Sequence, residues 1–501
     1  MTSAPRPAES TAPGKGPLSG EGRLLIDGEL VDASDGGTLL NIDPSTGKVA
    51  GTAASATADD MRRAIGAARR AFDEGTWATD PEFRSRCLRQ LHEAIVEEQE
   101  HLRRVIVTET GSPIALTYAV QLQQPIDESK YWAEMARGFE YEYETEPHEF
   151  LGARSRRIMR YEATGVVAAI TPWNYPFYLN VAESVPALAA GNAVILKPAQ
   201  LTPWSGLELG RLVAEKTDIP AGIFQVVTTG DHDVTELLTT DSRVDMVTIT
   251  GSTVTGRRVL AAAAETVKKV FLELGGKSAH IILDDADFPA VVPGAAVVCS
   301  HAGQGCTLST RLLVPRSRYD EVQTILKATF EQVPVGDVWD LATLQGPQVS
   351  AKQRDSILRA IEEGVVAGAR VLTGGRALAG REGYYIEPTV LVDVTPDMDV
   401  AQEEIFGPVL CVIPYDTVDD AVEIANSTIY GLAAEVSGGD DEAALAVARR
   451  LRAGSLSVNG GSYFSVSTPL GGYKQSGIGR RNGEEGFREY MELKSIGIPV
   501  R

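Results

Sequence analysis

The chain of 501 residues carries 47 Lys and Arg against 68 Asp and Glu, which gives a formal net charge of −21. Nucleic acids and anionic membrane surfaces are bound through clustered basic side chains, so this composition argues against both as partners. With 43% hydrophobic and 23% charged residues, the composition is that of a globular protein, and the length predicts two or three domains.

The N-terminal residues and the apolar stretches bear on where the chain resides. Residues 1–20 are rich in Pro, Ser, Ala and Gly and lack the apolar core of a secretory signal, so we expect a flexible tail. The richest apolar stretch, 179–196, is interrupted by Glu183 and Asn192, which excludes a membrane span. Four scattered cysteines do not make a disulfide framework. We therefore expect a soluble, cytoplasmic protein with no membrane partner.

Helical periodicity comes first along the chain. From Thr57 a Thr-x-x-Asp capping pattern opens an amphipathic helix. The apolar stripe of 82–106 then predicts a second helix, which carries His92 and His101 among charged residues. Segment 139–162 alternates charged and bulky residues, which indicates a β-hairpin that leaves its domain.

Two series of short β-branched runs follow, each interleaved with helical segments. The first runs through GVVAAI, AVILK, IFQVV, VDMVTIT and VKKVFLELGG, and it predicts a parallel sheet covered by helices on both faces. Ligands of such sheets bind beyond the carboxyl ends of the strands. The second series, from AHIIL to SLSVN, predicts another α/β domain. The terminal MELKSIGIPV is a candidate strand for a partner subunit.

Three turns at expected strand ends carry candidate chemical groups. Turn 171–176 contains Asn174, whose side-chain amide donates hydrogen bonds, although Asn is also a common turn former. Turn 249–256 leads a strand into a helix through small residues, which suits a phosphate, but it lacks the G-x-G-x-x-G pattern. In HAGQGCT, over 301–307, small neighbours leave the sulfur of Cys306 accessible.

A reactive thiol needs a base and an oxyanion donor. Glu273, at the apolar end of FLELGG, is a candidate base because desolvation raises a carboxyl pKa; its alternative role is an ion pair with a nearby Lys. Asn174 is the candidate donor, and His301 is a local rival for the base. A buried, inert thiol remains the alternative for Cys306. No His, Cys and Asp group shows metal-ligand spacing, so we expect no metal.

The motifs gain their meaning from their combination and order. PWNYP, KPAQ, ITGSTVTG, LELGGKS, GQGC, EEIFGPV and a late VNG before PLGGYKQSGIGR follow one another along the chain. Together they closely resemble the aldehyde dehydrogenase superfamily, from about residue 24 to the end. The resemblance implies an α/β fold with a Rossmann-like cofactor domain (21–138 and 163–274), a second α/β catalytic domain (275–485) and β oligomerisation elements (139–162 and 486–501).

The resemblance also implies a reaction. Cys306 would attack the aldehyde carbon, and the Asn174 amide and the backbone N–H of Cys306 would hold the oxyanion. Hydride transfer to nicotinamide leaves a thioester, and Glu273 would activate the water that hydrolyses it to the free acid. Relatives that pass the acyl group to CoA often lack this carboxylate, which favours hydrolysis. A CoA-acylating dehydrogenase and a non-catalytic cofactor-binding or structural member of the fold remain the alternatives.

A nicotinamide dinucleotide site follows from the same resemblance. Lys197 matches the lysine at the adenosine ribose, Ser252 the pyrophosphate donor and Glu404 the residue at the nicotinamide ribose. Gln200 stands where many members have a Glu that repels a 2′-phosphate, so we expect NAD and leave NADP open. The expected cofactor residues are Thr171, Pro172, Trp173, Lys197, Gln200, Thr250, Gly251, Ser252, Leu274, Gln353, Glu404 and Phe406.

The expected substrate pocket is mostly apolar and has no Arg anchor, which favours a medium-sized apolar or aromatic aldehyde over a carboxylate-bearing one. Ala182 and Glu183 stand where relatives carry a bulky aromatic residue and a lysine, so we expect a wider and more acidic funnel. The hairpin and the terminal strand imply a homodimer or homotetramer. The expected pocket residues are Tyr175, Ala182, Gly305, Thr307, Phe464 and Leu470.

Overall fold

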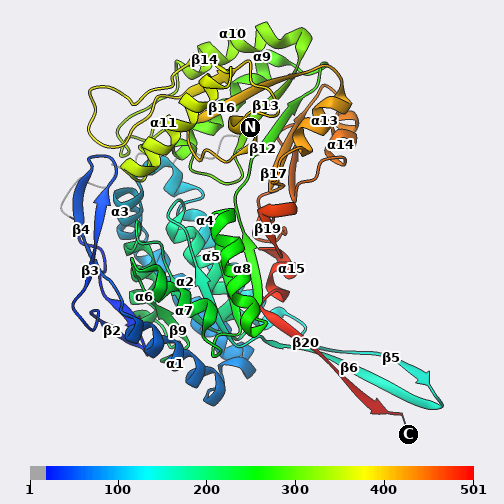
Figure 1. Cartoon of the computed structure of the whole chain (residues 1–501). Helices are drawn as coiled ribbons and strands as arrows, with labels where there is room; N and C mark the ends of the chain where they lie inside the picture. Colours follow the sequence, from blue (N-terminus) through cyan, green and yellow to red (C-terminus); the bar gives the residue numbers. More distant parts are fainter. Residues whose placement is uncertain (1–17, 501) are drawn as a thin grey trace.

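The computed structural model describes residues 18–500, which form two α/β lobes and a projecting β-arm (Figure 1). The first lobe contains an eight-stranded sheet in the order β19-β11-β10-β7-β8-β9-β1-β2. Its five central strands are parallel, as predicted, and the direction of winding reverses between β7 and β10. The carboxyl ends of strands beside such a reversal are the usual ligand site of this architecture. The strands are β1 (Leu24–Ile26), β2 (Glu29–Val31), β7 (Val166–Ile170), β8 (Ala193–Lys197), β9 (Phe224–Val226), β10 (Met246–Thr250), β11 (Lys269–Glu273) and β19 (Gly477–Ile478), with β3 (Thr38–Asp43) and β4 (Lys48–Ala54) in a separate pair.

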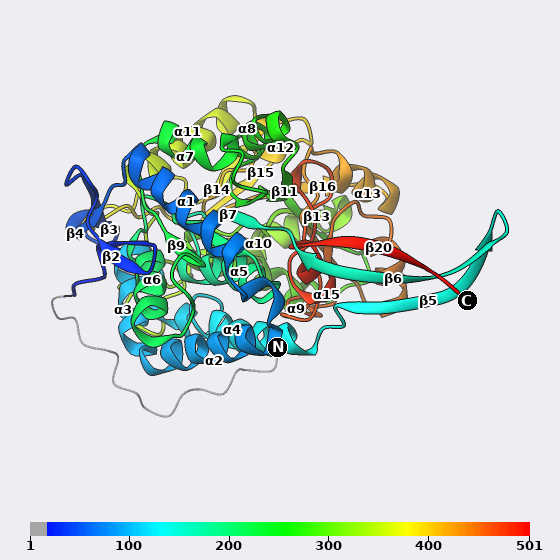
Figure 2. The same ribbon diagram turned by 90° about the horizontal axis from the view of Figure 1, so that it is seen from below.

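Helices cover both faces of this sheet, with α1, α7 and α8 on one face and α5 and α6 on the other (Figure 2). The capping box of Thr57 and Asp60 starts α1, as the sequence predicts. The expected single helix over 82–106 is two helices, because the backbone breaks at Glu98 between α2 and α3. The helices are α1 (Ala58–Glu74), α2 (Pro81–Glu97), α3 (Gln99–Thr110), α4 (Gln123–Gly138), α5 (Pro176–Ala189), α6 (Trp204–Lys216), α7 (His232–Thr240) and α8 (Thr253–Ala263).

The second lobe is built on a seven-stranded sheet in the order β14-β15-β16-β13-β12-β17-β18, parallel except for the β14–β15 pair. Its strands are β12 (Ser278–Ile282), β13 (Ser309–Pro315), β14 (Arg370–Thr373), β15 (Thr389–Val392), β16 (Val409–Tyr415), β17 (Ala433–Ser437) and β18 (Ser455–Val458). Its helices are α9 (Phe288–Val291), α10 (Tyr319–Phe330), α11 (Ala351–Val366), α12 (Asp399–Gln402), α13 (Val418–Asn426) and α14 (Asp441–Ala448). The β14–β15 hairpin was not predicted, because its runs are short and carry no alternating pattern.

The arm consists of β5 (Glu142–Phe150), β6 (Ala153–Ala163) and β20 (Met491–Pro499), and it projects from the first lobe (Figure 2). The terminal strand, expected to serve a partner, pairs antiparallel with β6 of its own chain. Before reaching it, the chain returns to the first lobe through β19 and α15 (Gly483–Arg488), and Phe487 and Tyr490 lie in the first core. The expected second domain, 275–485, therefore extends too far, because β19 pairs with β11 of the first sheet.

The start of the described chain also differs from expectation. We expected a flexible tail over 1–20, but Leu18 packs against the first core and Gly20 lies directly on the indole of Trp204. The rest of the expected tail, 1–17, lies outside the described residues. No helix within 18–500 is long and apolar enough to cross a membrane.

Candidate active site

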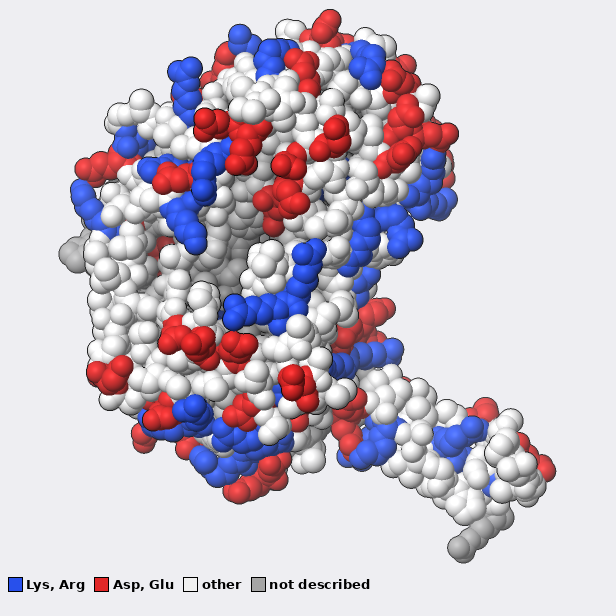
Figure 3. Space-filling model, in the orientation of Figure 1, with Lys and Arg blue, Asp and Glu red and all other residues white. Residues whose placement is uncertain are grey.

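Three strands of the first sheet bring polar residues to one edge. Strands β7, β10 and β11 lie side by side, and Thr250 is the register partner of Glu273. The turn after β7 carries Asn174 and β11 ends at Glu273, so the candidate donor and base lie at the same edge of the sheet, with β10 between their strands. The surface is hollowed between the two lobes on the face that Figure 3 shows.

The second lobe supplies Cys306 on a constrained loop. His301 and Ala302 both adopt left-handed backbone angles, with φ of 48° and 53°, a conformation that is disfavoured for residues with a side chain. Gly303 follows with φ of 76°, and a Cβ there would lie 2.0 Å from the carbonyl carbon of Gly407. Only glycine fits this turn, which places Cys306 at the mouth between the lobes, partly exposed.

Asn174 is held by contacts with the same loop. Its side-chain Nδ2 donates to the carbonyl of Gln304 at 2.9 Å, which leaves the second amide hydrogen free for a ligand. Its own carbonyl receives hydrogen bonds from Gln121 at 3.0 Å and from the Nε2 of His301 at 2.7 Å. His301, considered as a rival base, is thereby engaged with a peptide carbonyl, and burial lowers its pKa to about 4. It orients Asn174 and stays neutral.

Glu273 and Cys306 both have strongly raised pKa values. Glu273 is 4% exposed, its Oε1 has no hydrogen-bond partner among the described residues, and burial raises its pKa to about 8. Burial, together with the carboxyl groups of Glu404 and Glu273, raises the pKa of Cys306 to about 12. The thiol is therefore protonated at neutral pH, and a base must take its proton before it attacks.

A cavity of about 310 Å³ is lined by Cys306 and Asn174, whereas Glu273 lies outside its lining, directly before the lining residue Leu274. Its lining unites eleven of the predicted residues: Pro172, Trp173, Asn174, Thr250, Gly251, Ser252, Leu274, Cys306, Gln353, Glu404 and Phe406. Gly275, Ser356 and Ile405 also line it and were not predicted. Ser356 lies one turn after Gln353 on α11, so helical spacing was the signal that could have found it.

The lining fits the nicotinamide half of a dinucleotide. Glu404, at the cavity, accepts a hydrogen bond from the N–H of Gly276 at 2.9 Å, and burial raises its pKa to about 7. Trp173 and Phe406 form an edge-to-face pair with ring centres 5.4 Å apart. The N-terminus of α8 begins beside Ser252, and such an end attracts a pyrophosphate. A carboxylate for ribose hydroxyls, two aromatic rings and a helix N-terminus are thus present together.

Residues 30–496 match the model of the aldehyde dehydrogenase family. The chain belongs to this family. It is 39% identical to 3-succinoylsemialdehyde-pyridine dehydrogenase of a Pseudomonas species, over 94% of this chain and 98% of the relative. Among solved structures it is similar to a cysteine-to-alanine mutant of aldehyde dehydrogenase C from Pseudomonas syringae with NAD+ and octanal (38% identity, TM-score 0.89, coverage 95% and 96%). It is also similar to a Mycobacterium tuberculosis aldehyde dehydrogenase with NAD+ (37%, TM-score 0.92, coverage 96% and 99%).

Three expected cofactor residues of this aldehyde dehydrogenase are absent from the lining of the cavity. The hydroxyl of Thr171 donates to Asn180 at 2.6 Å and so faces α5. Lys197 ends β8, and burial lowers its pKa to about 8. Gln200 is exposed, and a Cβ on Gly230 would lie 3.3 Å from its Oε1, so it faces the 228–233 loop. Lys197 and Gln200 thus lie at and beyond the carboxyl end of β8, the strand next to β7 in the sheet.

The expected substrate side is partly assembled. Tyr175 and Ala182 share an apolar cluster with Tyr178 and Leu179, and the Tyr178 ring lies 6.1 Å from that of Phe464. A Cβ on Gly305 would lie 3.5 Å from the Tyr175 hydroxyl. Thr307 lies beside the hydroxyl of Tyr463, an aromatic residue that we did not predict.

Leu470 and Glu183 lie apart from this cluster. Leu470 is buried and pairs with Arg481 in a β-bridge beside Glu273. Glu183 is 0% exposed and hydrogen-bonded to Arg481, Thr248 and Thr250. The expectation of a more acidic funnel is wrong for Glu183, because its carboxylate is buried in an ion pair that the sequence did not reveal.

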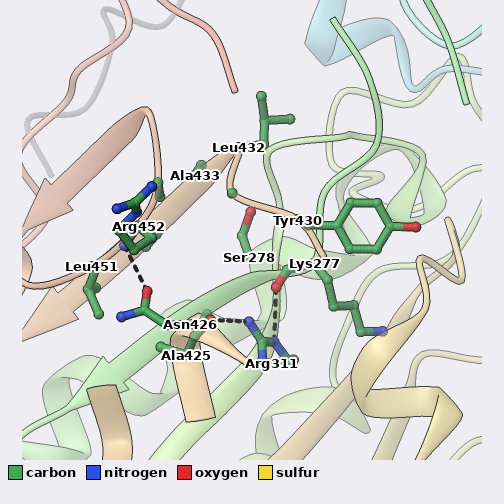
Figure 4. Close-up of a pocket in the computed structure, with 14 residues that line it drawn as sticks. Lys277, Ser278, Arg311, Ala425, Asn426, Tyr430, Leu432, Ala433, Leu451 and Arg452 are labelled. Atoms are coloured by element: carbon green, nitrogen blue, oxygen red, sulfur yellow. Dashed lines mark hydrogen bonds between the residues drawn. The ribbon is translucent and has the colours of Figure 1, made fainter. Parts of the chain in front are cut away.

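A second small cavity lies behind the LGGKS segment (Figure 4). Arg311 there donates to the carbonyls of Lys277, Ile424 and Ala425 at 2.8–2.9 Å. The ammonium group of Lys277 points away from Arg311 (Figure 4). At about 10 Å³ this cavity holds one water molecule at most, so it is not a substrate site. Its residues connect neighbouring segments of the second lobe through the hydrogen bonds of Arg311.

Proposed function

We propose that this aldehyde dehydrogenase oxidises an aldehyde to the carboxylic acid with NAD+, through a thioester on Cys306. The observation that supports it most directly is the single cavity shared by the Cys306 thiol, the Asn174 amide and the dinucleotide-type residues from both lobes. Glu273 takes the thiol proton, and the sulfur then attacks the aldehyde carbon to give a thiohemiacetal. The free amide hydrogen of Asn174 stabilises the oxyanion.

The chemistry that a bound NAD+ supplies here is acceptance of the hydride from that carbon. Trp173, Glu404, Phe406 and the Ser252 turn are the residues placed to hold it. Glu273 then loses the thiol proton to solvent. In the second half-reaction it removes a proton from water, which attacks the thioester carbonyl, and it returns that proton to the departing sulfur as the acid is released. A carboxyl group with a pKa of about 8 in an apolar setting suits this transfer near neutral pH.

The cofactor preference is proposed to be NAD over NADP. Similar structures contain NAD+, and Gln200 offers a ribose 2′-hydroxyl a neutral hydrogen-bond partner. The substrate is proposed to be a medium-sized apolar or aromatic aldehyde, because Tyr175, Tyr178 and Phe464 converge on the substrate side. One similar structure contains octanal.

The assembly is proposed to be a homodimer or homotetramer formed through the arm. Strands β5 and β20 are both edges of the arm sheet and carry exposed Phe150, Leu493 and Ile496. Unpaired strand edges with apolar side chains are prone to associate.

An absorbance assay of reduced nicotinamide tests the proposal. The protein is mixed with octanal, an aromatic aldehyde or succinic semialdehyde, with NAD+ or NADP+, and with or without CoA. We expect a CoA-independent signal that is greater with NAD+ and with the apolar aldehydes. Strict dependence on CoA would establish acyl transfer, and no signal under any condition would establish a binding-only protein.

A further inference from the structure

A buried ion pair lies behind the candidate base. Arg481 and Glu183 are 5% and 0% exposed, and the Nη2 of Arg481 donates both to Glu183 and to the hydroxyl of Thr250 at 2.7 Å. Glu183 accepts further hydrogen bonds from Thr248, from Thr250 at 2.5 Å and from Tyr490 at 3.4 Å. The four donors fix the carboxylate, and the carboxylate fixes the guanidinium.

The pair is tied to Glu273 through two elements. Thr250, which bonds both partners, is the register neighbour of Glu273 on the adjacent strand. On the other side, a β-bridge joins Arg481 to Leu470, and the next residue, Gly471, packs against the carboxyl group: a Cβ there would lie 3.0 Å from its Oε1. The segment that pairs with Arg481 thus covers the unpartnered oxygen of Glu273.

Several charged and titratable groups face this cluster. Arg481 and Arg480 lower the pKa of Glu273 against the dominant effect of burial, whereas Glu183 raises it. Arg481 also lowers the pKa of Cys306. The other groups around Arg481 are Tyr178, Glu128 and Tyr490. The charge of Arg481 therefore favours the anionic forms of both reacting groups, and Glu183 moderates that effect.

Stability alone does not account for the pair. A buried ion pair contributes little net stability compared with apolar residues of the same volume, because both charges lose their hydration. The Nε of Arg481 has no hydrogen-bond partner within residues 18–500, so the guanidinium is not fully satisfied by its structural contacts. Its position between Thr250, which lines the cavity, and the Leu470–Gly471 segment beside Glu273 indicates a role at the site instead.

We propose that Arg481, held by Glu183, is a positioning residue that favours the carboxylate form of Glu273 and eases the ionisation of Cys306 when that base takes its proton. The proposal rests on the proposed function, since it assigns the pair to the base and nucleophile of that reaction. It predicts opposite effects for the two partners. Loss of the cation raises the pKa of Glu273, and loss of the anion lowers it.

The test compares Arg481→Gln, Arg481→Lys and Glu183→Gln with the unmodified full-length protein. Stopped-flow absorbance with octanal and NAD+ separates the first burst of NADH from the later steady rate, which reports thioester hydrolysis. We expect the pH midpoint of the steady rate to rise by about one unit in Arg481→Gln, which slows hydrolysis about tenfold at pH 7. We expect it to fall in Glu183→Gln and to stay near the original value in Arg481→Lys.

A second readout needs neither aldehyde nor cofactor. Alkylation of Cys306 by iodoacetamide, followed by mass spectrometry against pH, reports the thiolate directly, while the buried Cys87, Cys299 and Cys411 serve as internal references. Its midpoint should rise in Arg481→Gln and not in Arg481→Lys. Circular dichroism verifies the fold of each variant. If Glu183→Gln does not fold, the comparison of Arg481→Gln with Arg481→Lys decides whether the inference holds. If a single Gln variant unfolds, the double variant Glu183→Gln with Arg481→Gln takes its place.

The outcomes separate the two proposals. Equal midpoints in Arg481→Gln and the unmodified protein, with rates reduced evenly at all pH values, would show a structural role and overturn the inference. Shifts of the same direction in Arg481→Gln and Glu183→Gln would overturn it as well. Absence of any NADH formation by the unmodified protein would instead contradict the proposed function.

Discussion

Two buried carboxyl groups in the first lobe show how the same side chain serves structure in one place and chemistry in another. Glu109 is 0% exposed and accepts hydrogen bonds from the Nδ2 of Asn41, from the N–H groups of Trp204 and Ser205, and from the Ser205 hydroxyl. It caps the first turn of α6, whose N-cap residue, Pro203, provides no side-chain hydrogen bond. Burial raises its pKa to about 7, against the effect of its four donors.

Glu273 is buried to a similar degree but is left without such donors. Its Oε1 has no partner within residues 18–500, and its pKa lies at about 8. A carboxyl group that is surrounded by donors is locked in place, whereas one that lacks them is free to accept a proton from a thiol or from water. Burial alone therefore does not identify a base; burial without partners does.

The largest expected effect is at the nucleophile that Glu273 serves. Cys306→Ala should abolish aldehyde oxidation, because no sulfur remains to form the thiohemiacetal, while its melting temperature stays near that of the unmodified protein. NADH absorbance and thermal unfolding measure the two quantities. Cys299→Ala is the matched control: Cys299 is 0% exposed in an apolar core, so its loss should lower stability and keep turnover. Substantial oxidation by Cys306→Ala would disprove the mechanism.

Glu273→Gln tests the functional half of the comparison. Loss of a general base commonly reduces a rate by about 10²- to 10⁴-fold, so steady turnover should fall in that range. Melting temperature should change little, because no hydrogen bond to Oε1 is removed. A remaining burst of NADH would place the defect in thioester hydrolysis. A lower melting temperature with unchanged turnover would assign Glu273 a structural role and end the contrast with Glu109.

Glu109→Gln makes the same substitution at the carboxyl group to which the comparison assigns a structural role. The amide NH2 would face donors at α6 and leave them unpaired, which costs about 1–3 kcal/mol of unfolding free energy. The turnover number of the folded protein should not change, since the hydrogen-bond partners of Glu109 are Asn41, Trp204 and Ser205, none of which lines the cavity. Urea unfolding and the NADH assay measure the two effects. A loss of turnover without a loss of stability would reverse the assignment.

Part of the contrast between Glu273 and Glu109 can be predicted from the sequence. The rest depends on contacts between residues that are far apart in the chain. Runs such as AVILK and VDMVTIT predict the parallel strands, and the strand ends then predict that Asn174 and Glu273 lie at the same edge of the sheet. Small residues around Cys306 indicate an accessible thiol. Those signals are local in the chain, and they predict which residues lie close together because parallel strands of an α/β sheet end at the same edge.

Contacts between distant residues leave no local pattern. Glu183 and Arg481 are separated by 298 positions, so neither the buried pair nor the return of β19 to the first sheet follows from periodicity. The same holds for Glu109, which caps a helix that starts 95 positions later. The break at Glu98 between α2 and α3 was missed for another reason, since the apolar stripe continues across it.

The smallest expected effect is at a third buried carboxylate, Glu208, which has a titrating partner. Its side chain is 2% exposed and bonds the Nε2 of His101 at 2.7 Å, and this hydrogen bond raises the pKa of His101 above 6.5. Since the folded pKa exceeds the unfolded one, the stabilisation is complete below about pH 6.5 and is lost as pH rises through the folded value. His101→Gln should therefore lower the unfolding free energy by about 0.5 kcal/mol near pH 6 and by less near pH 9, because the pair is partly screened by solvent. Urea unfolding at both pH values measures this, with the exposed His148→Gln on the arm as control. Equal penalties at the two pH values would mean that His101 contributes packing alone, and that a charged partner adds nothing to a carboxylate already held by neighbouring donors.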